Sequence, residues 1–185
     1  KEKIIDEKDF FIQAENLFHG ISCIAYSFNE KTKRKINLNY TKKFGLTRNP
    51  ALGKLQQGKT ITYKGKKITP KKGTILIPGK KITIISDTRY NKKLSSIAKN
   101  SDLLIIESTF LDRDKNKARD YKHLTAKQAA TVAKEAKVKK LVLTHLSERY
   151  KNKSEVLKEA KKTFKNVELA KDFFEVEIWS NFNRI

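Results

Sequence analysis

Several residue types are scarce in this chain, and each scarcity excludes a class of protein. The only cysteine, Cys23, has no partner for a disulfide within the chain and cannot form a thiolate zinc cluster, which favours the reducing cytoplasm. Methionine is absent and the chain opens with Lys1, so we expect the native start to lie upstream. No apolar stretch has the length of a membrane-spanning helix, so no membrane partner is expected.

Acidic residues are also scarce: 20 Asp and Glu stand against 42 Lys and Arg, which gives a formal net charge of +22. Two explanations remain open. A Lys-rich surface can serve solubility, whereas a polyanionic partner such as nucleic acid gains from each phosphate that is neutralised. With 38% hydrophobic and 34% charged residues, the 185-residue chain has the balance of a folded domain with its own core.

Glycine and proline are few and unevenly placed. The segment Lys31–Gly79 holds six of the seven glycines and all three prolines, is rich in lysine and has few long apolar runs. We interpret it as a basic excursion from the core, with short strands at Thr60–Tyr63 and Lys67–Thr69.

The rest of the chain alternates short apolar runs with amphipathic segments, which is typical of an α/β fold with helices covering the strands. The predicted strands are Phe10–Ala14, Ile21–Phe28, Lys81–Ile85, Leu103–Ile106 and Lys140–Thr144. The predicted helices are Lys92–Lys99, Thr125–Ala136 and Ser154–Phe164, the last opened by Ser154. Thr125 and Gln128 have the spacing of a capping box. The tail from Lys171 to Ile185 is predicted to form a packed element or a partner contact, with the packed element favoured, because it contains Phe173, Phe174, Val176, Ile178 and Trp179.

Polar residues gather where the predicted strands end. Asp87, Glu107 and His145 each follow an apolar strand, while His19 lies in the loop Asn16–Gly20 and His123 precedes a helix. A single histidine in a loop is more often a surface residue than a metal ligand. Three histidines in loops together with two carboxylates favour a site, and zinc binds imidazole and carboxylate where thiolate is lacking.

The motifs around these residues resemble ribonuclease Z, the metallo-β-lactamase-fold endoribonucleases that trim the 3′ end of precursor tRNA. The motifs are, in chain order, Phe18–Gly20, Cys23–Tyr26, Phe44–Gly58, Ser86–Arg89, Glu107–Phe110, Tyr121–Ala126 and Leu143–Tyr150. The resemblance runs from about residue 10 to residue 150. It implies that residues 1–185 form the carboxy-terminal half of one αββα sandwich domain, with the basic segment as an exosite-like arm.

The resemblance also implies roles for individual residues. Asp87 would bridge two zinc ions, with His19 on one ion and His145 on the other. Glu107 and His123 would form a pair in which His123 donates a proton to the leaving 3′ oxygen.

Further residues of these motifs would bind the substrate, precursor tRNA. Arg89 and Arg149 would contact its phosphates, because a guanidinium can bind two oxygens at once. For Arg89 a salt bridge beside a helix is an equally open interpretation. Ser147 would contact a phosphate or orient His145, or only cap its turn. Thr88 and Thr109 are expected to support their loops, Thr125 to cap a helix and Tyr150 to pack.

Three features depart from the family pattern. The His-x-His-x-Asp-His motif, which supplies four more metal ligands and the base, is absent, and we expect it upstream of Lys1 or on a separate chain. Asn49-Pro50 replaces a Gly-Pro pair of the arm, and His123-Leu124-Thr125 replaces His-Ser-Thr. Each metal would have about two protein ligands, fewer than zinc needs. We therefore predict a poor nuclease that requires an amino-terminal half, and a homodimer of the complete enzyme.

Two alternative functions remain open. The chain could be a non-catalytic RNA-binding or assembly module of the same fold, or another metallo-β-lactamase-fold phosphodiesterase. Retention of His19, Asp87, Glu107, His123 and His145 speaks against a decayed enzyme.

Overall fold

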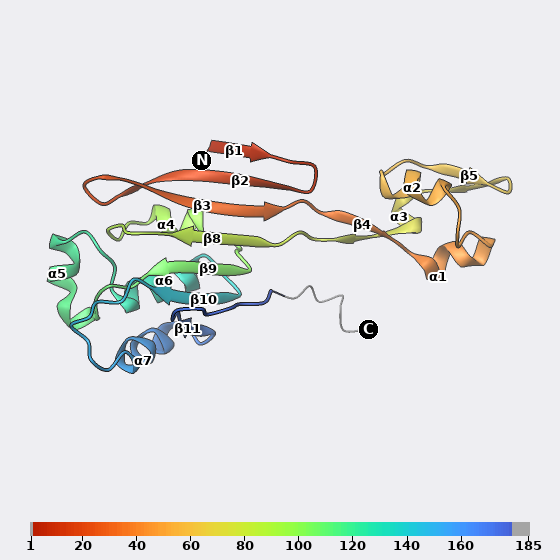
Figure 1. Cartoon of the computed structure of the whole chain (residues 1–185). Helices are drawn as coiled ribbons and strands as arrows, with labels where there is room; N and C mark the ends of the chain where they lie inside the picture. The colour runs from red at the N-terminus through yellow and green to blue at the C-terminus, as the bar shows by residue number, and fades with distance from the viewer. Residues whose placement is uncertain (1, 179–185) are drawn as a thin grey trace. The chain divides into compact units, whose positions relative to one another are not determined.

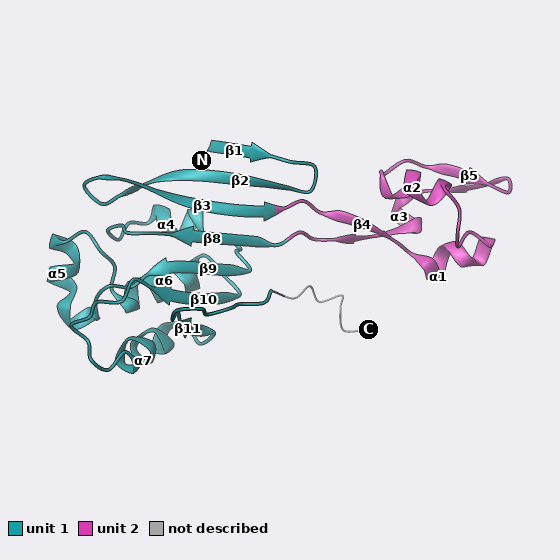
Figure 2. Ribbon diagram, in the orientation of Figure 1, with its two compact units in different colours: residues 1–29, 80–185 teal, residues 30–79 magenta. Residues whose placement is uncertain are grey.

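The structure is a computed structural model that describes residues 2–178 of the chain. The chain folds as two compact units (Figure 2). Unit 1 contains residues 1–29 and 80–185, and unit 2 contains residues 30–79. Among the described residues, no helix combines the length and the apolar character needed to cross a bilayer.

Unit 1 is built on a seven-stranded mixed sheet with the strand order β1-β2-β3-β8-β9-β10-β11 (Figure 1). The strands are β1 (Glu2–Asp6), β2 (Phe10–Phe18), β3 (Ser22–Glu30), β8 (Lys81–Ile85), β9 (Leu103–Glu107), β10 (Lys140–Thr144) and β11 (Val167–Leu169). The pairs β1–β2 and β3–β8 are antiparallel, whereas β8, β9, β10 and β11 run parallel. Parallel neighbours need crossover connections, and these carry the helices of the unit.

The two longest helices of unit 1 pack on strands β9, β10 and β11, and the shorter helices join them in the crossover connections. The helices are α4 (Lys93–Ile97), the short 3₁₀ helix η2 (Asp112–Asp114), α5 (Lys115–Asp120), α6 (Ala126–Glu135) and α7 (Ser154–Thr163). The alanines of α6 are fully buried against leucine and isoleucine side chains of β9 and β10. Small alanine side chains let the helix lie close to the sheet, where close-packed apolar contacts supply most of the stability.

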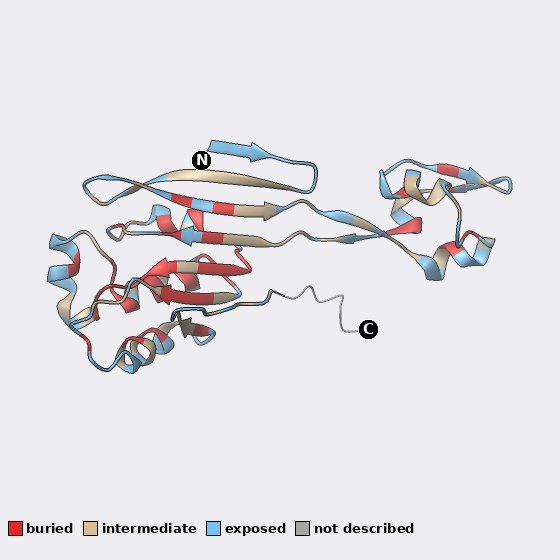
Figure 3. Ribbon diagram, viewed as in Figure 1, coloured by how far each residue is buried: buried red, intermediate tan, exposed pale blue. Residues whose placement is uncertain are grey.

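The opposite face of the same sheet is less covered. Ile24, Tyr26 and Ile84 are 38–46% exposed on this face. Tyr26 and Ile84 are cross-strand partners on β3 and β8. The adjacent residues Ala25 and Ile85, which point to the helix side, are at most 1% exposed. Figure 3 shows the contrast between the buried strands β9 and β10 and the more exposed β1 to β3. Unit 1 thus has one covered and one partly open sheet face.

Unit 2 contains two small antiparallel sheets, β4–β7 and β5–β6. Its elements are β4 (Lys33–Ile36), α1 (Leu38–Thr41), η1 (Lys42–Phe44), α2 (Ala51–Gln56), β5 (Ile61–Tyr63), β6 (Lys66–Ile68), α3 (Pro70–Gly73) and β7 (Thr74–Ile77). Its own core consists of Leu46, Leu55, Ile61 and Ile68. A Cβ at Gly73 would lie 3.0 Å from Leu55 Cδ1 and 3.1 Å from Ile68 Cγ2, so the backbone passes close to this core. That this basic segment is an exosite-like arm stays a prediction.

Most elements predicted from the sequence are present, and strands β8 and β10 have the predicted bounds. The capping box of Thr125 and Gln128 is formed. The loop predicted at Asn16–Gly20 is wrong in part, because β2 continues through Phe18. Helix α7 begins at Ser154 as predicted, and Asn152 Oδ1 accepts the N–H of Ser154.

The tail forms no regular element as far as the structure describes it, although Phe174, Val176 and Ile178 are partly buried. Residues 170–178 form no helix or strand, and the side chain of Phe173 is fully exposed. Apolar composition alone does not decide burial, because burial needs a neighbouring surface as well as an apolar side chain. Trp179, part of the same prediction, lies outside the described residues.

Candidate active site

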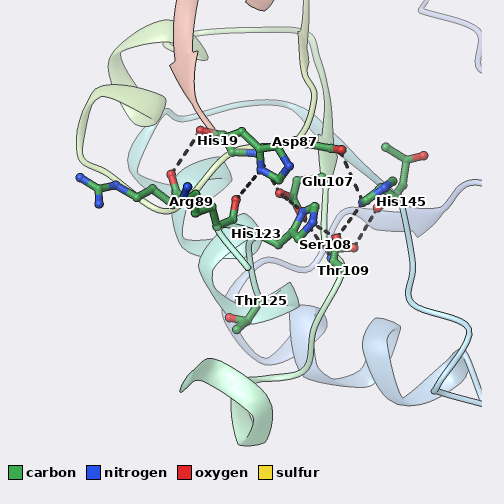
Figure 4. Close-up of polar contacts among 12 residues, drawn as sticks. His19, Asp87, Arg89, Glu107, Ser108, Thr109, His123, Thr125 and His145 are labelled. Atoms are coloured by element: carbon green, nitrogen blue, oxygen red, sulfur yellow. Dashed lines mark hydrogen bonds and ion pairs between the residues drawn. The ribbon is translucent and has the colours of Figure 1, made fainter. Parts of the chain in front are cut away.

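Five polar side chains converge at the carboxyl edge of the parallel strands (Figure 4). Asp87 follows β8, Glu107 ends β9 and His145 follows β10. Since β9 and β10 are parallel and pair Glu107 with Thr144, these residues meet at the same edge. His19 reaches it from the β2–β3 turn and His123 from the segment before α6.

The distances between these groups are those of one site. The Nδ1 atom of His145 lies 3.4 Å from Asp87 Oδ1. The ring of His123 lies 4.6 Å from the ring of His19 and 5.1 Å from that of His145, measured between centroids. The structure therefore brings together all five residues for which metal-binding or catalytic roles are predicted, although the roles themselves stay predictions.

Glu107 is fully buried and uses both carboxylate oxygens. Oε1 accepts the N–H of Thr88 at 2.9 Å and lies 3.0 Å from His123 Nδ1. Oε2 accepts the hydroxyl of Thr109 at 2.8 Å and the N–H of Thr109 at 3.3 Å. A buried carboxylate is tolerated only when it is compensated in this way. With its oxygens occupied by protein donors, Glu107 orients its neighbours and is not placed as a metal ligand.

Hydrogen bonds fix which ring nitrogen of His19 and His123 is free. The Nδ1 atom of His19 lies 2.9 Å from the carbonyl oxygen of Lys122. A carbonyl can only accept, so Nδ1 of His19 carries the proton. The carboxylate of Glu107 accepts from Nδ1 of His123 in the same manner. Nε2 of both rings is therefore left for a metal ion or a substrate.

The tautomer of His145 is set through a hydroxyl. Thr109 Oγ1 lies 2.8 Å from His145 Nδ1 and donates its one hydrogen to Glu107 Oε2. It therefore accepts from Nδ1–H of His145, which again leaves Nε2 as the free nitrogen. From the sequence, Thr109 is expected only to support its loop. A hydroxyl two residues after a buried strand-end carboxylate is the signal that could have indicated this contact.

Two loops of the site have unusual backbone conformations. His145 and Lys122 are left-handed, with φ of 53° and 61°, which costs about 1 kcal/mol or more for a residue with a side chain. Gly20, at φ 94°, faces Lys122, and a Cβ there would lie 3.2 Å from Lys122 Cδ. The glycine thus allows the close approach in which His19 meets the Lys122 carbonyl. Strain that surrounding contacts maintain is a recognised property of functional sites.

The donor set fits a metal centre. Candidate ligand atoms of His19, Asp87 and His123 lie within 4.8 Å of one another, and so do those of Glu107, His123 and His145. Imidazole nitrogen and carboxylate oxygen are donors that zinc accepts. The oxygens of Glu107 are already occupied by hydrogen bonds. The histidine nitrogens and Asp87 are therefore better candidate metal ligands than Glu107.

The three predicted substrate-binding residues lie around this centre. The guanidinium of Arg89 stacks on the Phe18 ring at 4.0 Å, and no carboxylate among the described residues pairs with it, which speaks against the salt-bridge interpretation. Arg149 lies over Phe110 at 5.0 Å, and its Nε donates to Ser147 Oγ at 3.2 Å. Ser147 therefore orients Arg149 and makes no hydrogen bond to His145 in the described structure.

The supporting residues divide between local structure and the site. Thr125 caps α6 as predicted, and Tyr150 packs, with its hydroxyl accepting from Leu111 N–H at 3.0 Å and donating to Asp114. Thr88 supports its loop as predicted, since its hydroxyl bonds the backbone of Phe18. The N–H of Thr88 has the further role of donating a hydrogen bond to the carboxylate of Glu107.

No protein-family profile matches the chain. The ribonuclease Z of Nitrosopumilus maritimus (strain SCM1) is 44% identical over 181 residues, which cover 96% of this chain and 60% of that protein. Two solved structures superpose on the chain. The metallo-β-lactamase-fold protein YhfI from Bacillus subtilis does so with a TM-score of 0.59 and 22% identity, over 92% of this chain and 50% of that one.

The short form of human tRNase Z superposes with a TM-score of 0.56 and 25% identity, over 95% of this chain and 46% of that one. The fold is therefore that of the metallo-β-lactamase α/β sandwich, and the chain spans only 46–60% of the length of these three proteins. The chain is homologous to ribonuclease Z over nearly its whole length and matches 60% of the length of the relative from Nitrosopumilus maritimus.

Proposed function

We propose that this chain is part of a zinc-dependent endoribonuclease that removes the 3′ trailer of precursor tRNA. The observation that carries the proposal is the convergence of His19, Asp87, His123 and His145 at one sheet edge, each histidine with Nε2 free. The homology to ribonuclease Z supplies the class of substrate.

In this reaction a water oxygen forms a bond to the scissile phosphorus and the bond from phosphorus to the 3′ oxygen breaks. The proton of the water would pass to the base expected in the His-x-His-x-Asp-His motif. The trailer leaves with a 5′ phosphate and the tRNA keeps a 3′ hydroxyl. His19, Asp87 and His145 would hold zinc, which lowers the pKa of water and offsets the charge of the phosphate when bound. His123 donates the proton that the leaving 3′ oxygen needs, and Glu107 holds its ring through Nδ1. Arg89 and Arg149 bind phosphate oxygens beside the site.

The remaining ligands are proposed to come from a part of the protein outside these 185 residues. The three predicted ligands are too few for two zinc ions, each of which takes about four ligands. The relative from Nitrosopumilus maritimus is also longer, since the chain spans 60% of it. The open face at Ile24, Tyr26 and Ile84 would pack against the other sheet of the sandwich. A homodimer of the complete enzyme stays a prediction.

Unit 2 is proposed to contact the tRNA. The net charge of +22 favours a polyanionic substrate, and structured RNA is recognised largely through its shape and backbone. The buried residues Leu46, Leu55, Ile61 and Ile68 show that unit 2 has a folded core, at odds with a structureless solubility loop. A folded basic unit can present its charges at fixed positions.

The test uses the complete protein, with the amino-terminal part restored, zinc and a 3′-extended tRNA. We expect cleavage at the 3′ end. Asp87→Ala should lose bound zinc as well as activity, because it removes a carboxylate that would hold the metal. His123→Ala should keep zinc and slow cleavage by about 10²–10⁴-fold, the usual contribution of a general acid.

Equal zinc loss in both variants would contradict the roles assigned to these residues. A zinc-loaded complete protein that binds the tRNA but does not cleave it would remove the nuclease proposal. That result would favour the non-catalytic RNA-binding alternative.

A further inference from the structure

A pocket of about 420 Å³ opens beside His123. Its volume is within the range of small-ligand sites, roughly 300–1,000 Å³. The residues that line it are cationic or neutral: Arg89, Tyr90, Lys115, Asn116, Arg119, His123 and Gln128. With three fixed cations and no carboxylate in its lining, the pocket is suited to an anionic ligand.

The cations of this pocket are available to such a ligand. Lys115 and Arg119 are four residues apart on α5 and therefore share one face of the helix. No carboxylate among the described residues pairs with Lys115 or with Arg89, whose guanidinium is held over Phe18. Arg119 Nε donates to Asp120 at 3.2 Å in a solvent-exposed pair. Exposed pairs of this kind contribute little, and the other N–H groups of the guanidinium remain.

The place of the pocket relative to the chemistry indicates which part of an RNA it would hold. His123 lines the pocket, and in the proposed reaction it protonates the leaving 3′ oxygen. The nucleotide that carries this oxygen must therefore lie next to His123. Figure 4 shows the Arg89 side chain extending away from Asp87 and His145, so this cation is directed away from the scissile phosphate.

We propose that this pocket binds the nucleotide whose 3′ oxygen leaves, with Arg89, Lys115 and Arg119 facing its 5′ phosphate. Tyr90 and Asn116 supply an aromatic ring and an amide for its base or ribose. The inference rests on the proposed function, because that function defines which oxygen leaves. It adds a subsite for the last nucleotide of the mature tRNA.

Adenosine 5′-monophosphate is a minimal analogue of that nucleotide, since it has a 5′ phosphate and a free 3′ hydroxyl. We expect the zinc-free 185-residue chain to bind it at least about tenfold more tightly than adenosine at low salt, because the phosphate contributes the electrostatic part. Titration calorimetry or NMR chemical shifts would measure both affinities. Equal binding of adenosine and its monophosphate would overturn the proposal.

The variant Lys115→Ala/Arg119→Ala tests the site itself, and Arg113→Ala/Lys117→Ala is its control. Arg113 and Lys117 belong to the same segment but pair with Glu155 and Asp114 and do not line the pocket. Both variants lose two positive charges. The first should weaken binding of the monophosphate about tenfold or more, and the control should change it less than about twofold. Equal loss in both variants would mean general charge attraction and would overturn the proposal.

The two proposals fail separately in these experiments. If the pocket variant loses the monophosphate but the zinc-loaded complete protein never cleaves tRNA, the nuclease proposal fails and a nucleotide site remains. If the complete protein cleaves tRNA and the pocket variant binds and cleaves like its control, the subsite proposal fails.

Discussion

At the scale of single residues, the main finding is that side chains which do not contact the substrate set the geometry of those that would. Glu107 bonds His123 directly and reaches His145 through the Thr109 hydroxyl. Such outer partners typically change metal affinity by about 10- to 100-fold when they are removed. Thr109 is therefore a positioning residue for His145.

Thr109→Val removes this hydroxyl while keeping the shape of the side chain. We expect zinc affinity of the complete protein to fall by about 10- to 100-fold, because Nδ1–H of His145 loses its acceptor and the ring can turn. Thr109→Ser should restore it. Zinc titration measures the affinity, and nitrogen NMR of the His145 ring reports its tautomer. A valine variant with unchanged affinity and tautomer would contradict the role.

The candidate site could be predicted from the sequence only in part. Asp87, Glu107 and His145 were accessible because apolar strands of similar length precede them, and parallel strands place their ends together. The hydrogen bond between His19 and the Lys122 carbonyl cannot be predicted from the sequence. It joins residues 103 apart and depends on the left-handed backbone of Lys122. Hydrogen bonds to backbone carbonyls depend on loop conformation, which residue types alone do not determine.

At the scale of elements, the edge of the sheet opposite the site is fastened by a single carboxylate. Asp102, which is 7% exposed and precedes β9, accepts the N–H of Lys81 at 2.8 Å, at the start of β8. It also accepts from Nζ of Lys139 at 2.8 Å, next to β10, and from Nζ of Lys80 at 3.3 Å. Three parallel strands are thus joined where their amino ends meet.

These contacts make the stability of the fold depend on pH. Burial raises the pKa of Asp102, but the hydrogen bonds from Lys139, Lys81 and Lys80 outweigh burial and hold the pKa below its usual value. A lowered pKa in the folded state means that the stabilisation is complete above the unfolded pKa of about 3.9 and is lost as the pH falls through the folded pKa.

Asp102→Asn removes this charge. It should lower the free energy of unfolding by roughly 1.5–3 kcal/mol at neutral pH, the range for hydrogen bonds to charged groups. Below about pH 4 the difference from the wild type should shrink. Urea unfolding at several pH values measures both effects, and a difference that stays constant down to pH 2 would contradict the assignment.

The elements themselves differ in how far the sequence predicts them. The capping box of α6 and the continuous apolar runs of β8 and β10 are local signals, and the structure contains them where predicted. Strand β1, with all five residues exposed, has no burial pattern to detect. The short helices of unit 2 escaped detection because four to six residues are too few for helical periodicity.

At the scale of the whole molecule, the uneven covering of the sheet predicts behaviour in solution. Tyr26 and Ile84 lie side by side on the open face, and exposed apolar surface of this kind marks an interaction site. The isolated chain should bind an apolar dye such as ANS or associate with itself, and the complete protein should do so much less.

Tyr26→Ser/Ile84→Ser should reduce dye binding by the isolated chain. Leu38→Ser/Leu76→Ser is a matched control, because those residues are also about half exposed but belong to unit 2. Circular dichroism confirms that each variant is folded. If dye binding falls in the unit 2 control and not in the sheet variant, the dye binds a surface other than the open sheet face.

Glu107 has a consequence for how this part of the chain tolerates substitution. Because one carboxylate bonds His123 directly and reaches His145 through the Thr109 hydroxyl, the positions of the two rings are coupled. A substitution at Glu107 would affect both histidines. The free-energy effects of substitutions at His123 and Thr109 would not be additive.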